Sequence, residues 1–95
     1  MEISREELFR KKLEELLQFV LEKDQKYSGD KPLNSIVDNA KAFNITPLKF
    51  CLLRINDKWN RVRNNPEDVK LIAEELRDIW GYAFEGLILI DMEEC

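Results

Sequence analysis

A chain of 95 residues with a net charge of −4 is the size of one small domain, and its acidic balance argues against nucleic acid as a partner, which requires a basic surface. The chain has no histidine, which excludes histidine metal ligands and histidine-activated nucleophiles. Three glycines, three prolines and 36% charged residues favour an all-α fold, a single bundle-like domain of four helices over residues 1–95. Its core is so small that oligomerisation is expected to complete it.

The first predicted helix begins at a capping box, Ser4 with Glu7, in which each side chain satisfies a free backbone N–H of the first turn. Apolar residues then recur at helical spacing, so the helix should run to about Lys26. A loop follows over residues 27–32, where glycine and proline interrupt the pattern. A short helical segment is expected over residues 34–43, with these apolar side chains inward: Ile36, Val37, Ala40 and Phe43.

The third predicted helix starts at Thr46 and Pro47, because a capping threonine followed by proline in the first helical turn is a strong start signal. It should run to about Asn64. Its main apolar face is Leu48, Leu52, Ile55, Trp59 and Val62. The opposite side carries Phe50, Leu53 and Asp57, so the helix is expected to be covered on both faces.

The fourth predicted helix starts at Asn65-Pro66, which repeats the cap-plus-proline signal and places Glu67 and Asp68 in the first turn, as the helix dipole prefers. One of its stripes is apolar and is predicted to face inward: Val69, Ile72, Leu76, Ile79, Ala83, Leu87 and Ile90. Residues 79–90 are apolar nearly all round, which is typical of a buried helix. Four helices of this length cannot cover it, so a second subunit is expected to do so.

The chain opens on a charged amphipathic segment instead of a signal peptide, and no apolar run approaches the roughly 20 residues of a membrane span. A cytoplasmic location is therefore expected (the host cytoplasm if a phage encodes the chain), with no membrane partner. Cys51 lies in an apolar run and is predicted to be a buried free thiol, whereas Cys95 is expected to be frayed.

Two acidic helical segments form the one constellation with a recognisable chemistry. Glu75 and Asp78 share a face of the fourth helix with Tyr82 one turn further on, while Asp57 and Arg61 share a face of the third. Carboxylates at such spacing on facing helices suit Mg²⁺, which takes oxygen ligands and often carries substrate phosphates. The predicted metal ligands are Asp57, Glu74, Glu75 and Asp78.

Each of these residues also has a structural interpretation. The acids of the fourth helix could form a solvated face, and Asp57 could pair with Arg61 across one turn. Tyr27, beside Lys26 at the loop, could stack on a base or lie half-buried on the core. In the functional interpretation, the predicted ligand-binding residues are Lys26, Tyr27, Lys58, Arg61 and Tyr82.

A family resemblance rests on three stretches of the chain and on Asn34. The stretches are Lys26–Gly29, residues 54–61 with Asp57-Lys58 and Arg61, and residues 74–83. Residues 20–92 are similar to the nucleotide-modification-associated domain of phages and bacteria, which is similar to the MazG-type all-α nucleoside triphosphate pyrophosphohydrolases. The resemblance implies an oligomeric helical bundle. It also implies that acidic pairs on two helices bind Mg²⁺ and that a nucleotide is cleaved between its α and β phosphates.

Two functions stay open, because this chain departs from the related proteins at two places. Those proteins usually carry a second acidic pair where this chain has only Asp57, and they tend to carry an acid before the loop tyrosine where this chain has Lys26. In the enzyme, Asp57, Glu75 and Asp78 are catalytic and hold Mg²⁺, which neutralises phosphate charge and lowers the pKa of an attacking water. In the alternative, a non-catalytic homo-oligomer of phage type captures a nucleotide signal or binds a host protein.

Overall fold

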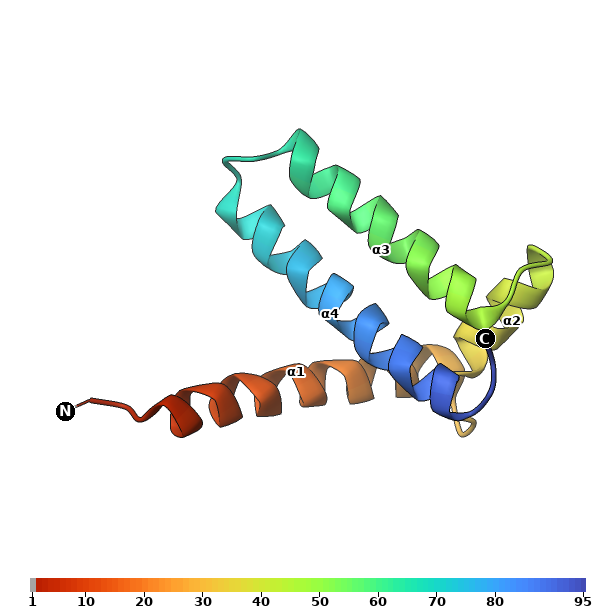
Figure 1. The fold of residues 1–95 in the computed structure, drawn as a ribbon, viewed down its shortest axis with the longest axis horizontal. Helices are drawn as coiled ribbons and strands as arrows, with labels where there is room; N and C mark the ends of the chain where they lie inside the picture. The colour runs from red at the N-terminus through yellow and green to blue at the C-terminus, as the bar shows by residue number, and fades with distance from the viewer. Residues whose placement is uncertain (1) are drawn as a thin grey trace.

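The computed structural model describes residues 2–95, and over that range the chain forms four α-helices and no strand, which confirms the all-α prediction. The helices are α1 (Arg5–Ser28), α2 (Asn34–Ala42), α3 (Pro47–Asn64) and α4 (Val69–Asp91). In Figure 1, α3 and α4 run side by side as an antiparallel hairpin, α2 packs at one end of it, and α1 crosses below. No helix of this described part is both long and apolar enough to cross a membrane.

Two of the predicted helix starts are made by the side chains that the sequence indicates. The hydroxyl of Ser4 accepts a hydrogen bond from the Glu7 N–H at 3.1 Å, and the Thr46 hydroxyl accepts one from the Lys49 N–H at 3.2 Å. The predicted start at Asn65-Pro66 is wrong: a carboxylate oxygen of Asp68 accepts a hydrogen bond from the Leu71 N–H and caps α4, so the helix begins at Val69 and Asn65 and Pro66 precede it. These caps satisfy N–H groups that have no partner inside the helix. The end of α1 lies two residues beyond the predicted Lys26, so Tyr27 and Ser28 of the expected loop are helical.

The core is small and lies where α2, the start of α3 and the end of α4 meet. Leu33, Ile36, Cys51 and Leu89 form it, with Tyr82 and other partly buried apolar residues packed around them. The prediction of Cys51 as a buried free thiol is confirmed. Burial raises the pKa of the Cys51 thiol to about 11, with the charge of Glu85 adding to the effect, so the thiol is uncharged at neutral pH.

Two glycines let neighbouring helices approach α4 closely. A Cβ at Gly81 would lie 3.4 Å from a methyl group of Val20 on α1, and one at Gly86 would lie 3.4 Å from Leu48 on α3. Both glycines are buried. The inner face of α4 is therefore the one that carries its glycines, and both α1 and α3 pack against it.

The predicted orientation of the apolar stripe on α4 is wrong for the single chain. Leu87 and Ile90 of that stripe are exposed, together with Val69 and Leu76 near the other end of the helix. An apolar pattern that continues nearly all round a helix does not tell which face is inward. The inner face is set instead by side chains that fit against α1 and α3.

Two smaller predictions of inward-facing residues also fail. On α3, Leu52 and Trp59 are about half exposed, whereas Cys51 is buried. On α2, Ile36 and Ala40 are buried as predicted, but Phe43 is largely exposed. These apolar side chains lie on the surface of a chain whose radius of gyration is 15.0 Å, against about 12.4 Å for a compact domain of this length.

Candidate functional site

Five charged side chains from three helices meet against the inner face of α4, and we call them the ionic cluster: Lys23, Lys58, Arg61, Glu75 and Asp78. The Nζ atom of Lys23 on α1 lies 2.8 Å from an oxygen of Asp78. From α3, the Lys58 Nζ atom lies 3.3 Å from the other oxygen of Asp78, and Arg61 lies 3.2 Å from Glu75. Four of these five residues belong to the predicted site, and Lys23 is new.

Glu75 is the most deeply buried charged residue of residues 2–95, with 5% of its surface exposed. Its Oε1 atom is held by Arg61. Its Oε2 atom is buried and has no hydrogen-bond partner in the described chain, since the Lys58 Nζ atom is 3.7 Å away. A buried carboxylate oxygen without a donor is costly. The ionic cluster therefore contains one acceptor that is free to take a further ligand.

Asp78 is held in its charged form. Burial would raise its pKa, but the hydrogen bond and charge of Lys23 together with those of Lys58 outweigh this effect, and the pKa lies below its usual range. Asp78 is consequently ionised at neutral pH and is neutralised by two lysines.

Asp57 and Glu74 do not join the other two acids of the predicted metal site. Asp57 lies on the outer side of α3, 58% exposed, and pairs with Arg54 at 3.2 Å instead of with Arg61. Glu74 is exposed on α4. Within residues 2–95 no three acidic or cysteine side chains are placed to hold a metal ion. Successive residues of a helix point about 100° apart, so when Lys58 turns inward its neighbour Asp57 turns away.

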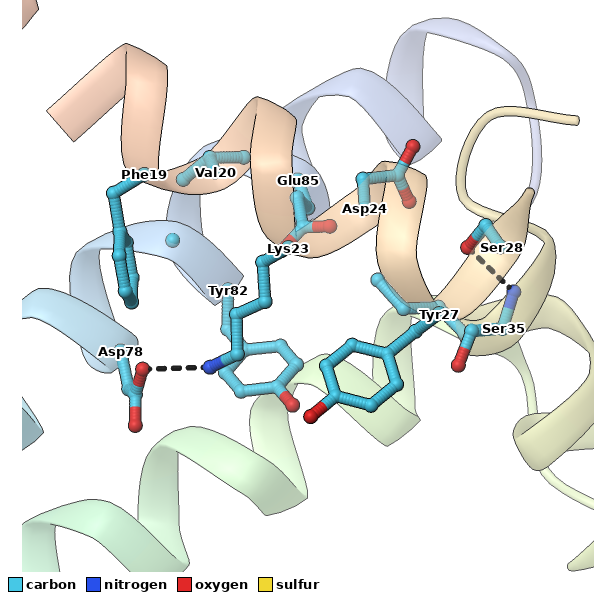
Figure 2. A pocket seen from close by; sticks show the side chains of 12 residues that line it. Phe19, Val20, Lys23, Asp24, Tyr27, Ser28, Ser35, Asp78, Tyr82 and Glu85 are labelled. Carbon is cyan, nitrogen blue, oxygen red and sulfur yellow. Dashed lines mark hydrogen bonds and ion pairs between the residues drawn. The ribbon is translucent and has the colours of Figure 1, made fainter. Parts of the chain in front are cut away.

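A small pocket of about 60 Å³ lies between α1, α2 and α4, beside the ionic cluster. Figure 2 shows Lys23 reaching past the ring of Tyr82 to Asp78, with Tyr27 alongside and both tyrosine hydroxyls pointing toward the same side. Asp24 and Glu85 line the opposite part of the pocket. The two predicted ligand tyrosines, 55 positions apart, therefore share one site.

This pocket opens into a wider groove of about 480 Å³ between α1, α2 and α3, which we call the α2–α3 groove. Two cations, Lys23 and Arg54, line it, and Arg54 lies over the ring of Tyr82 at 5.9 Å. The remaining lining is aromatic or polar apart from one aliphatic residue, Ile36: Tyr27, Ser35, Asn39, Phe43 and Phe50. The groove thus combines hydrogen-bond donors that suit phosphate oxygens with flat rings that suit a base.

Three of the five predicted ligand residues lie outside the α2–α3 groove. Lys26 lines a neighbouring groove on the other side of Lys23, and Lys58 and Arg61 are engaged with the acids of the ionic cluster. Sequence reasoning missed Lys23 and Arg54. The spacing offered a signal for Lys23, which precedes Tyr27 by one helical turn.

Asp24 and Glu85 are further acids that the sequence did not single out. The carboxylate of Asp24 accepts a hydrogen bond from the backbone N–H of Leu33 at 3.1 Å. This bond fixes the start of α2, where Leu33 has a φ of 61°. The pKa of Glu85 is raised to about 7, chiefly by burial and then by the charge of Asp24, while the charge of Lys23 opposes both effects. Glu85 thus titrates near neutral pH.

Stability should consequently fall as the pH rises from about 5 to 8. The pKa of Glu85 is about 7 in the folded chain and near 4.5 in the unfolded chain, so protonation of Glu85 stabilises the folded state. This contribution to the free energy of unfolding is fully present below pH 4.5 and is lost as the pH rises through about 7. Glu85→Gln should remove most of this slope and raise stability at pH 8 by about 1 kcal/mol after allowance for partial exposure. Thermal melts across this range test it, and equal slopes for both proteins would contradict it.

Comparison with protein-family models, with curated proteins and with solved structures finds no match to this chain. The MazG-like resemblance therefore rests on the motif residues. Of these, Lys58, Arg61, Glu75 and Asp78 meet in the ionic cluster, and Tyr82 lines the adjoining groove.

Proposed function

We propose that this chain is a MazG-like protein that binds a nucleotide or a related phosphorylated small molecule in the α2–α3 groove. The observation that carries the proposal is the presence of Lys23 and Arg54 beside Tyr27 and Phe43 in one open groove. Arginine and lysine supply the donors that phosphate oxygens need. The exposed rings of Tyr27 and Phe43 offer a face on which a base can stack.

Ligand binding without catalysis is favoured by the ion pairs that Glu75 and Asp78 already make. Asp78 already contacts Lys23 and Lys58, and Glu75 contacts Lys58 and Arg61. A metal ion would have to compete with these cations, and the third predicted acid, Asp57, lies on the outer side of α3. The chain alone therefore offers two neutralised carboxylates.

A Mg²⁺-dependent nucleoside triphosphate pyrophosphohydrolase is the second candidate, and the partnerless Oε2 atom of Glu75 favours it. Mg²⁺ is commonly bound through one or two carboxylates while substrate phosphates supply further oxygens, so Glu75 and Asp78 would suffice as protein ligands. Mg²⁺ bound there would neutralise phosphate charge and lower the pKa of an attacking water. Lys23 and Arg54 would position the phosphates in either function.

We expect a nucleoside triphosphate to raise the melting temperature of the protein, because a ligand that binds only the folded state stabilises it. Arg54→Ala should weaken that ligand about 10- to 100-fold, the range for one charged hydrogen bond. Arg63→Ala, an exposed position on the same helix, is the matched control and should bind like wild type. Melting curves and titration calorimetry with a panel of nucleotides, with and without Mg²⁺, measure both effects.

The same panel separates the two candidates. Pyrophosphate release by wild type and not by Asp78→Asn would select the enzyme, whereas binding without product from either protein would select capture. Absence of binding by every nucleotide, or equal binding by Arg54→Ala and wild type, would contradict the proposed site.

A further inference from the structure

The first half of α1 carries a row of apolar side chains that residues 2–95 leave about half exposed or more. Leu8, Phe9 and Leu13 are each more than half exposed, and Leu17 follows them on the helix. In Figure 1 this half, which we call the α1 arm (residues 5–17), extends away from the α3–α4 hairpin. A helix with large apolar side chains and no tertiary support is marginal by itself in water. The arm is therefore suited to packing against a partner.

An open groove of about 960 Å³ lies between the α1 arm and α4. Its apolar wall is formed by Leu8, Phe9, Leu13 and Leu16 on one side and Trp80 on the other. The Trp80 ring stacks on Phe84 at 5.0 Å between ring centres, which holds the ring in place. The groove runs along the arm, so a helix is the element that matches it in shape.

The exposed surface is large enough to accommodate a partner. The chain exposes 7481 Å², whereas a compact monomer of this size exposes about 5,700 Å². The excess is roughly 1,800 Å², and a standard protein–protein interface buries about 800 Å² on each side. A dimer interface therefore fits within the excess.

The charges of the arm favour a second copy of the same chain as that partner. Residues 5–15 carry four basic and four acidic side chains in alternating blocks, the basic block being Arg10-Lys11-Lys12 and the following acids Glu14-Glu15. Two antiparallel copies centred near Leu13 place the basic block of one copy beside these acids of the other. Such a pairing is neutral as a whole and closes on itself with two-fold symmetry.

We propose that the α1 arm is a dimer interface, in which the arm of each copy fills the groove between the arm and Trp80 of the other. The exposed outer face of α4, which includes Leu87, is then not required for dimerisation. The proposal is independent of the nucleotide site, because none of these residues lines the α2–α3 groove.

Sedimentation of the full chain tests the interface. Wild type should sediment as a dimer at micromolar concentration, and the double variant Phe9→Glu/Leu13→Glu as a monomer. Both positions are exposed in the single chain, so the variant should keep the α3–α4 hairpin. Any loss of helical circular dichroism signal should be confined to the arm, which then has no partner to pack against. Leu87→Glu, an equally exposed apolar position outside the arm, should remain dimeric.

A second measurement needs no variant. The melting temperature of wild type should rise with protein concentration, because a dimer is stabilised by mass action. A monomeric wild type, an arm variant that stays dimeric, or dissociation by Leu87→Glu with the arm variant unaffected would each overturn the proposal.

Discussion

Lys58→Met should destabilise the fold by about 3 kcal/mol, the lower end of the range for breaking a buried ion pair, because each acid keeps one other cation. The Lys58 side chain is 12% exposed and is the closest cation to the Oε2 atom of Glu75, an oxygen that already has no hydrogen bond. Asp78 keeps Lys23 and Glu75 keeps Arg61, but Oε2 would then face an apolar methionine. In a domain of this size the melting temperature should fall by more than about 10 °C, measurable by circular dichroism.

Two further variants show whether burial causes that loss. Arg54→Met removes an ion pair whose carboxylate, on Asp57, is well exposed, so it should cost less than about 1 kcal/mol. Adding Glu75→Gln to Lys58→Met removes the unpaired charge and should recover much of the stability. A Lys58→Met protein as stable as wild type would contradict this prediction.

Leu89→Ala should have an effect of comparable size, about 3–4 kcal/mol, within the range for deleting a large buried side chain. Leu89 is fully buried and packs in the cluster that joins α2, α3 and α4. Few side chains share this core, so the cavity has little prospect of being filled by rearrangement. Urea unfolding followed by circular dichroism measures the loss.

Leu87→Ala is the matched control for that experiment. It lies two residues away on the same helix but is 65% exposed, so the change in unfolding free energy should stay within about 0.5 kcal/mol. Equal losses at the two positions would mean that the outer face of α4 is as well packed as the inner one.

The number of helices and most of their bounds could be predicted from the sequence by itself. Caps and prolines act within one helical turn, so Ser4 and Thr46 predict two helix starts without reference to the rest of the chain, whereas Asn65-Pro66 placed the start of α4 too early because Asp68 further along makes the cap. Helical spacing, which is also local, predicts correctly that Glu75 and Asp78 lie on one face of α4. It could not give the end of α1, because Tyr27 and Ser28 are helical in a segment where glycine and proline follow closely.

The tertiary structure decided which faces are inward and which acids meet. The sequence pattern shows apolar residues nearly all round α4, and only packing against Val20 and Leu48 makes the glycine face the inner one. The same packing turns Lys58 toward Asp78 and leaves Asp57 outside. Lys23 reaches Asp78 across 55 positions of sequence, a contact that helical spacing does not encode because spacing relates residues only within one helix.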